Sequence, residues 1–217
     1  KTNHNKLDKI FVGYQYRFNP VLIKLKNFLD NKIFGEIISV RCINGEYLPH
    51  WHPYEDYKIS YASRRSLGGG ALLTQIHDFD YIVWLFGIPK SVYCVGGKLS
   101  NLNIDVEDTV QINLQMENKV PISINLNYLE LMPNRSIQVI GDEGTVYCDL
   151  IENTLTYKKL NKKKKKITFK KFDRNQMFIE EMKSFINFVR YKKENKSDIR
   201  NAMKSLYLVH KSKISLR

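Results

Sequence analysis

The stretch LGGGALLTQIHDFDYIVWLFG, residues 67–87, is the part of the sequence on which the interpretation of the whole chain depends. Three consecutive glycines lead into an apolar run with helical spacing, which ends at Gly87. Such a run predicts a largely buried helix. The same helix carries His77 and the carboxylates Asp78 and Asp80. A titratable imidazole on an otherwise apolar helix indicates a candidate catalytic or binding site.

The composition places the chain among globular proteins. Its 217 residues are enough to bury a core, and 43% of them are hydrophobic. No apolar run is long enough to span a bilayer, so we expect no membrane partner. The cysteines Cys42, Cys94 and Cys148 lie far apart without a CxxC pair. We therefore predict a reduced, cytoplasmic protein without a metal site.

Most of the excess positive charge lies in one segment. The net charge is +13, and residues 157–172 contain nine lysines. The flanking residues alternate as two strands do, so we interpret the lysine run as the solvated tip of a hairpin. A docking patch for nucleic acid or polyphosphate is the alternative, and nucleic acid is not the partner we expect. The acidic residues Asp105, Glu107 and Asp108 precede a predicted strand and are interpreted as solvated.

The hydrophobic periodicity predicts a fold of class α+β. Helical spacing indicates helices over residues 20–35, 67–87, 176–193 and 198–216. Alternation of apolar and polar residues indicates strands within residues 9–18, 36–48, 91–99, 108–117, 120–130, 135–150 and 154–171. Residues 49–66 show no period and predict a long ordered loop. We therefore expect a predominantly antiparallel open sheet with helices packed on one face.

Five motifs, taken in order, resemble the C-terminal half of a known enzyme family. They are VGYQYRFNP, WHPYEDYKISYASRRSLGGG, GGGALLTQIHDFDYIVWLFG, DVEDTV and IQVIGDEGTVYCDL. Together they resemble the glucose–fructose oxidoreductase, inositol dehydrogenase and MocA (Gfo/Idh/MocA) family over essentially the whole chain. The loop and glycine triplet look most like members that act on sugars or nucleotide sugars in surface-polysaccharide pathways.

The resemblance implies a two-domain, NAD(P)-dependent dehydrogenase. In such enzymes an N-terminal Rossmann domain holds the dinucleotide, and a C-terminal domain holds the substrate and builds a homo-oligomer through its sheet. No GxGxxG and no Glu-Lys-Pro motif occurs here. We therefore expect residues 1–19 to be a remnant of the nucleotide-binding domain, with its last strand over 9–18. Residues 20–217 would be the C-terminal substrate-binding and oligomerisation domain.

The cofactor that the resemblance implies is NAD or NADP. Because the Gly-rich turn that holds a pyrophosphate is absent, we expect this chain alone to bind neither. A separate Rossmann-domain polypeptide would then complement the chain, or the chain is a degenerate remnant.

The residue that matches the family's proton-relaying histidine is His77. An imidazole titrates near neutrality and suits this task. Asp80 shares its helical face and is expected to fix the tautomer of the ring. Many family members carry an aspartate one turn earlier, where this sequence has Thr74. Thr74 and Asp80 are both candidate substrate-binding residues. The alternative is that His77 is a packed helix residue tied to Asp80. The glycine triplet favours a site, because glycines allow a ligand to approach the backbone closely, although a tight turn also explains them.

Further substrate contacts are expected from two segments. Arg17 matches a family position near cofactor and substrate, where a guanidinium can bind a hydroxyl, carboxylate or phosphate; a surface salt bridge is the alternative. In the aromatic loop, Trp51, Tyr57 and Arg64 are candidate sugar contacts.

Two functions remain open at this point. The first is the substrate-binding part of an NAD(P)-dependent sugar or nucleotide-sugar oxidoreductase, which transfers hydride at a secondary alcohol or ketone. The second is a non-catalytic sugar-binding or oligomerisation module.

Overall fold

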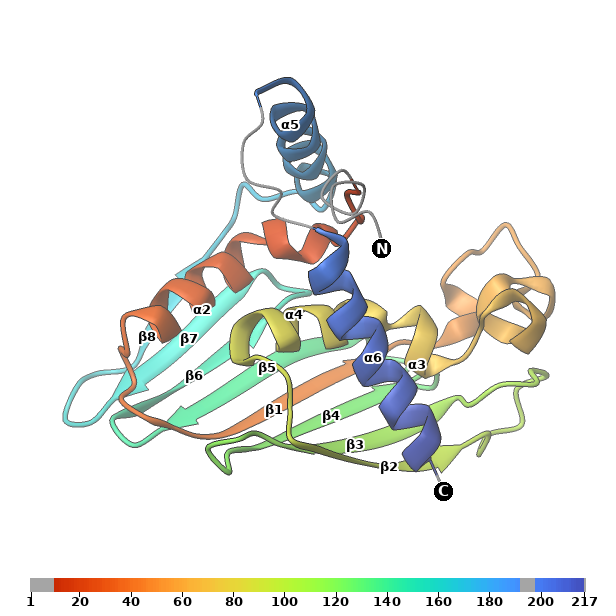
Figure 1. Cartoon of the computed structure of the whole chain (residues 1–217), viewed down its shortest axis with the longest axis horizontal. Helices are drawn as coiled ribbons and strands as arrows, with labels where there is room; N and C mark the ends of the chain where they lie inside the picture. Colours follow the sequence, from red (N-terminus) through yellow and green to blue (C-terminus); the bar gives the residue numbers. More distant parts are fainter. Residues whose placement is uncertain (1–9, 192–197, 217) are drawn as a thin grey trace, which may run out of the picture.

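The computed structural model describes residues 10–191 and 198–216 and contains one eight-stranded sheet (Figure 1). The strand order is β2-β3-β4-β1-β5-β6-β7-β8. Neighbouring strands are antiparallel, except that β1 pairs parallel with β4. The strands are β1 (Ile37–Gly45), β2 (Ser91–Gly97), β3 (Thr109–Gln115), β4 (Pro121–Asn127), β5 (Asn134–Gly141), β6 (Gly144–Asp149), β7 (Thr154–Lys159) and β8 (Lys165–Thr168). The predicted α+β fold is confirmed.

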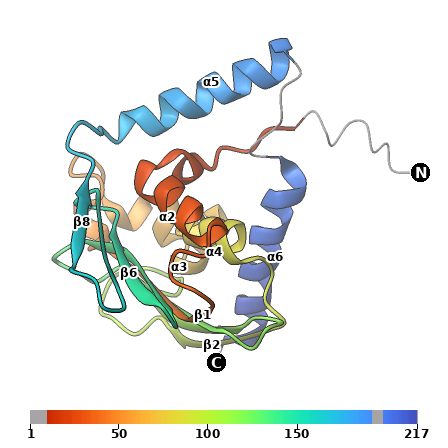
Figure 2. The same cartoon turned by 90° about the vertical axis from the view of Figure 1, so that its left-hand side faces the viewer.

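The helices lie on one side of this sheet, with α5 standing away from it (Figures 1 and 2). They are α2 (Pro20–Asp30), α3 (Ala71–Thr74), α4 (Ile76–Phe86), α5 (Asn175–Tyr191) and α6 (Ile199–Ser215). Short 3-10 helices are η1 (Gln15–Phe18), η2 (Leu48–His50), η3 (Tyr57–Ile59), η4 (Tyr61–Ser63) and η5 (Arg65–Leu67). The last four give the aromatic loop an ordered backbone, as predicted. No described helix has the length and apolar character needed to cross a membrane.

The period-two pattern of the strands separates a buried face from an open one. On β3, Val110, Ile112 and Leu114 are buried against the helices, while Gln111 and Asn113 point outward and are exposed. The same alternation recurs on β4. The core therefore lies between the sheet and the helices, and the outer face of the sheet is polar.

The lysine run forms the predicted hairpin. Strands β7 and β8 pair antiparallel, and β8 is the last strand of the sheet. Edge strands expose unpaired backbone groups, and lysines on such a strand discourage pairing with another chain. Lys165 and Lys166 of β8 therefore suit an edge strand, and a docking role for the lysine run stays an untested alternative.

The strand predicted over residues 9–18 is wrong for the described part of that range. Residues 10–18 contain a single bridge, from Phe11 to Asp198, followed by the 3-10 helix η1. The side chains of Gln15, Tyr16 and Arg17 are all buried. A strand directs consecutive side chains to opposite faces, so a turn of helix is the better way to bury three in a row. Residues 1–9 of the expected remnant domain lie outside the described residues.

The three consecutive glycines, residues 68–70, are required by the local backbone conformation and packing. Gly68 and Gly70 have φ of +81° and +102°, which favours glycine. A Cβ on Gly69 would lie 2.5 Å from the carbonyl oxygen of Ala62. The close approach that glycine permits here is to the preceding loop, so the triplet is explained without a ligand.

Candidate functional site

His77 lies in the first turn of α4, with its imidazole half-buried beneath the segment 14–17. The rings of Tyr14 and Tyr16 pack against it, with centroid distances of 5.9 and 5.5 Å. The amide nitrogen of Gln15 lies 3.4 Å from Nε2. This is long for a hydrogen bond, so a substrate hydroxyl could replace it. Nδ1 is buried and has no hydrogen-bond partner within the described residues.

The environment of His77 keeps its ring neutral. Burial lowers its pKa from 6.5 to about 4, and the positive charges of Arg135 and Arg174 act in the same direction. The negative charge of Asp78 opposes them. At pH 7 the imidazole is therefore unprotonated, but with a pKa of about 4 it is a weaker base than the imidazole titrating near neutrality that the sequence predicts.

The expected contact between Asp80 and His77 is not formed. Asp80 instead accepts two hydrogen bonds from Arg17, at 2.7 and 2.8 Å, and one from the hydroxyl of Ser205 at 3.0 Å. The Arg17 and Asp80 side chains are only 5% and 1% exposed, so this is a buried, bidentate ion pair and not a surface salt bridge. Arg17 ties η1 to α4 and α6 and so positions the segment that covers His77.

A second buried pair lies on the other side of the helix. Asp78 is fully buried and accepts hydrogen bonds from Arg135 at 2.9 Å and from Asn44 at 2.7 Å. The Tyr81 hydroxyl also donates to Asp78. Arg135 donates to the hydroxyl of Tyr16, and its guanidinium lies 4.4 Å from the centre of that ring. The Tyr16 ring also packs against the His77 ring, so Tyr16 connects this ion pair to His77.

A cavity of about 210 Å³ opens beside this second pair. Its wall includes Tyr16 from η1, Asn44 from the end of β1 and Arg135 from the start of β5. The rest of the polar wall consists of Arg174, Asn153, Asn19, Asn134 and the carboxylate of Glu46. The Nε atom of Arg135 is buried without a partner in the described part of the chain. Amide and guanidinium donors around a small cavity suit a polyhydroxylated or anionic ligand.

The three candidate sugar contacts of the aromatic loop, Trp51, Tyr57 and Arg64, do not line this cavity. Trp51 packs edge-on against Tyr128, with ring centroids 5.3 Å apart. The Tyr57 hydroxyl accepts a hydrogen bond from the backbone of Asn103, and Arg64 donates to the carbonyl of Lys58. These bonds hold the loop together, and a substrate role for Trp51, Tyr57 and Arg64 stays a prediction.

Thr74 has two partners inside the protein. Its hydroxyl donates to the carbonyl oxygen of Gly70 at 2.8 Å and also bonds the hydroxyl of Tyr128. No hydrogen bond joins Thr74 to His77 among the described residues. Thr74 therefore belongs to the support of the glycine turn, and its expected contact with a substrate stays a prediction.

Sequence reasoning missed Gln15, Asn44 and Arg135. Arg135 is separated from Asp78 by 57 residues, and only the pairing of β5 with β1 brings it beside Asn44. One feature of the sequence pointed to such partners. Two aspartates lie on an apolar helix, and a buried carboxylate needs a hydrogen-bond or ion-pair partner.

The described residues do not fit a dinucleotide pyrophosphate. Such a group binds at the N-terminus of a helix that follows a strand and a Gly-rich turn. Here the triplet follows η5, and α3 is four residues long. The carboxylate of Glu107 already accepts a hydrogen bond from the first turn of α3, at Leu72 N. A negative charge at that position would repel a phosphate.

Comparison with known proteins adds the following findings. A family model described as the GFO/IDH/MocA C-terminal domain matches residues 22–147. An uncharacterized oxidoreductase of Synechocystis sp. is 24% identical, over 63% of this chain and 42% of the relative. The chain thus spans less than half of that relative.

Solved structures with the same fold include sugar and nucleotide-sugar dehydrogenases. The WlbA dehydrogenase from Bordetella pertussis, in complex with NADH and UDP-GlcNAcA, is 25% identical with a TM-score of 0.74, over 95% of this chain and 62% of that one. UDP-N-acetylglucosamine 3-dehydrogenase from Acidithiobacillus ferrooxidans is 15% identical with a TM-score of 0.73, over 94% and 60%. A putative oxidoreductase from Thermotoga maritima is 19% identical with a TM-score of 0.78, again over 94% and 60%.

Proposed function

The chain belongs to the GFO/IDH/MocA family, and from this premise we propose that it is the substrate-binding part of an NAD(P)-dependent oxidoreductase acting on a sugar or nucleotide sugar. The observation that carries the proposal is the state of His77. Its imidazole is neutral, half-buried and covered by a long hydrogen bond from Gln15 that a substrate hydroxyl can replace.

The proposed chemistry is the interconversion of a secondary alcohol and a ketone. In oxidation, Nε2 of His77 would accept the hydroxyl proton, and a nicotinamide held outside the described residues would supply the hydride acceptor. In reduction, His77 returns the proton to the forming alkoxide. Because the turn before α3 does not fit a pyrophosphate, the nicotinamide would be held by residues other than those the structure describes.

The cavity beside Arg135 supports the assignment of a sugar-derived substrate. Amide groups of Asn44 and Asn153 and the free Nε of Arg135 can donate hydrogen bonds to hydroxyl or carboxylate oxygens. His77 does not line this cavity, and Tyr16 borders both the cavity and the His77 ring, so a ligand in the cavity would have to reach past Tyr16 to contact the imidazole. The WlbA dehydrogenase structure is a complex with UDP-GlcNAcA, and another relative is a UDP-N-acetylglucosamine 3-dehydrogenase, which fits this substrate class.

Assembly and location follow from the same proposal. The outer face of the sheet is broad, polar and free of helices in the described chain, so we place a homo-oligomer contact there. The three free, buried cysteines fit a reducing compartment, and we place the protein in the cytoplasm.

Calorimetric titration with UDP-N-acetylglucosamine, and separately with NADH, tests the proposed function. We expect the sugar nucleotide to bind the chain and NADH not to bind it. His77→Ala removes one hydrogen bond to the ligand and is expected to weaken sugar binding by roughly tenfold. Lys158→Ala, in the exposed part of β7, is the control and should leave binding unchanged. If no sugar nucleotide binds, or if His77→Ala binds as wild type does, the site assignment is wrong.

A non-catalytic sugar-binding module is the second candidate. The position of Thr74 favours it, because its hydroxyl is engaged by Gly70 and Tyr128 and cannot carry charge. Sugar binding that His77→Ala abolishes, with no hydride transfer when a Rossmann-domain polypeptide and NADH are added, would select this second function.

A further inference from the structure

The hairpin formed by β7 and β8 carries more lysines than the protection of an edge strand requires. Lys165 and Lys166 lie on β8 itself, whereas the lysines of residues 162–164 lie in the turn that joins the two strands. Lysines in this turn have no ladder to protect, because β8 begins at Lys165. We define the lysine tip as Lys158 together with the five consecutive lysines of residues 162–166, all of which are exposed.

The lysine tip has no counter-charge within the described chain. The one lysine of this hairpin with an ion pair there is the half-buried Lys159, which lies 3.6 Å from the carboxylate of Glu143. No described carboxylate is within ion-pair distance of the lysines of the tip. Consecutive like charges repel one another, and an anion bound from outside would relieve this repulsion.

The lysine tip is separate from the cavity beside Arg135. The wall of that cavity includes Asn153, which directly precedes β7, and the turn with residues 162–164 follows the other end of this strand. A strand of six residues is about 20 Å long. Figure 1 shows the turn at the left-hand end of the sheet. A ligand on the lysine tip would therefore bind independently of a ligand in the cavity.

The aromatic side chains of this hairpin offer no surface on which bases could stack. The ring of Tyr157 packs against Phe28 and Phe34, with centroid distances of 5.3 and 6.0 Å, and so faces the core. Phe169 is also partly buried against the core. Proteins that bind single-stranded nucleic acid combine positive charge with aromatic rings on which bases stack. The lysine tip supplies charge alone, which suits a polyanion without bases.

The spacing of the lysines sets the charge density of a matching ligand. Five consecutive residues span at most about 17 Å of backbone, so residues 162–166 place one positive charge about every 3.4 Å. In a chain of directly linked phosphates, every phosphorus atom carries a negative charge. In a single nucleic-acid strand, a sugar separates neighbouring phosphates. The ammonium group of lysine binds phosphate as a point charge and needs no fixed bidentate geometry.

We propose that the lysine tip binds a linear polyphosphate. Lys165 pairs with Tyr157, whose ring faces the core, so alternation along β8 directs Lys166 to the opposite face of the hairpin. The lysines therefore surround the tip, and a flexible chain of phosphates contacts more of them than a flat surface does. This binding site is additional to the proposed oxidoreductase function and does not depend on it.

Duplex DNA is the competing partner. Its phosphates are also closely spaced, and its major groove admits a two-stranded β-ribbon. Base readout in that groove relies largely on Arg, Asn and Gln side chains. Residues 157–172 contain no arginine or glutamine, and their one asparagine is Asn161. The hairpin thus lacks the side chains that would make a complex with DNA specific.

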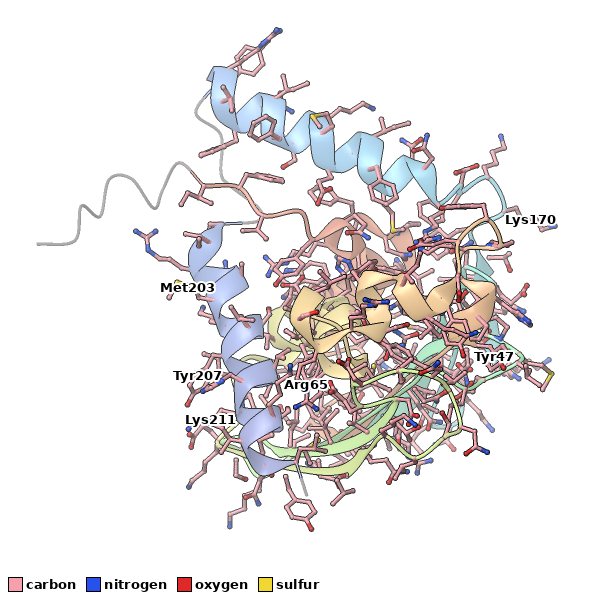
Figure 3. All side chains as sticks on the ribbon, turned by 90° about the vertical axis from the view of Figure 1, so that its right-hand side faces the viewer. Tyr47, Arg65, Lys170, Met203, Tyr207 and Lys211 are labelled. Carbon is pink, nitrogen blue, oxygen red and sulfur yellow. The ribbon has the colours of Figure 1, made fainter. Side chains whose placement is uncertain are left out.

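Fluorescence anisotropy with end-labelled polyphosphate, measured over a series of salt concentrations, tests the proposal. The hairpin variant replaces the lysines of residues 162–166 by glutamine. The matched control replaces five exposed lysines elsewhere by glutamine, which are Lys90, Lys98, Lys183, Lys204 and Lys211. Figure 3 shows Lys211 on α6, on the opposite side of the molecule from Lys170, which follows β8. Both variants remove five positive charges from a net charge of +13.

The two variants should differ in affinity and in salt dependence. Each lysine–phosphate contact contributes roughly 0.7 to the slope of the logarithm of affinity against the logarithm of salt concentration, taking single strands as the guide. The hairpin variant should therefore reduce this slope by about 3 and weaken binding at low salt by at least about tenfold. The control should bind within about twofold of wild type, because its lysines are dispersed.

The outcomes separate local from general charge effects. All replaced lysines are exposed, so circular dichroism should show that both variants are folded. Absence of binding by the wild type overturns the proposal. Equal weakening by both variants also overturns it, since net charge alone would then explain the binding. Tighter binding of duplex or single-stranded DNA with the same number of phosphates would assign the lysine tip to nucleic acid and overturn the proposal as well.

Discussion

The two positively charged regions of this protein use charge in opposite ways. Beside His77, the side chains of Arg17 and Arg135 are only 5% and 15% exposed, and each is paired with an aspartate of α4. In the hairpin, the lysines of residues 162–166 are exposed at the edge of the sheet. Far fewer charges lie in the first region, yet they fix the positions of η1, β5 and α4 around the candidate site. Burial, and not the number of charges, decides which of them organise the fold.

The largest expected effect comes from breaking a buried pair. Asp78→Asn leaves the guanidinium of Arg135 buried without a counter-charge. Removing one partner of a buried ion pair costs about 3–5 kcal/mol, and we expect a loss of unfolding free energy in this range. Urea denaturation followed by circular dichroism measures it.

The matched control removes a carboxylate from an exposed turn. Glu117→Gln, between β3 and β4, should unfold at the same urea concentration as wild type. If Asp78→Asn lowered the unfolding free energy by less than about 1 kcal/mol, Asp78 would behave as a surface charge. That result would contradict the contrast between the buried charges near His77 and the exposed charges of the hairpin.

The pH dependence of stability is the next effect in size. The pKa of His77 is about 4 in the folded chain, below the unfolded value of 6.5. The unfolded state therefore binds more protons between these values, and stability falls as the pH drops from 6.5 to 4. Linkage sets an upper limit of about 3 kcal/mol for this loss. His77→Gln should lose correspondingly less stability over this window in urea titrations at pH 7 and pH 4.5. An unchanged difference between the two pH values would show that His77 is not the group responsible.

The smallest effect is expected at the hairpin. Replacing Lys162 to Lys166 by serine should change the melting temperature by no more than about 2 °C, because these side chains are solvated. We expect retention on heparin to weaken, since fewer charges remain. Aggregation at low salt should increase, because β8 loses part of its protection as an edge strand. A melting temperature lowered by more than about 5 °C would show that the lysines stabilise the fold.

The strands and helices were predictable because their periods report which face is buried. Val110, Ile112 and Leu114 alternate with polar residues, and this pattern alone predicts one face of β3. Residues 9–18 do not show such a sustained alternation of apolar and polar residues. Their course depends on tertiary contacts, such as the ion pair of Arg17 with Asp80, and the expected strand was wrong.

Burial of single carboxylates was harder to predict. Asp108 is fully buried, contrary to the expectation that it is solvated, and it accepts bonds from the backbone of Leu99 and Ser100 and from the Ser100 hydroxyl. These donors come from a turn whose shape the sequence pattern does not specify. His77 was proposed as a site residue from the motif that contains it. Arg135 comes close to Asp78 only because β5 pairs with β1, and no pattern in the sequence around Arg135 predicts this pairing.

The claim on which this account depends is that His77 is a neutral imidazole placed to exchange a proton with a sugar-derived alcohol. A titration of ¹⁵N-labelled histidine side chains by NMR, with and without UDP-N-acetylglucosamine, tests it directly. The account predicts that His77 titrates near pH 4 and that its ring signals shift when the sugar nucleotide is added. A pKa at or above 6.5, together with signals that the sugar nucleotide leaves unchanged, would contradict it.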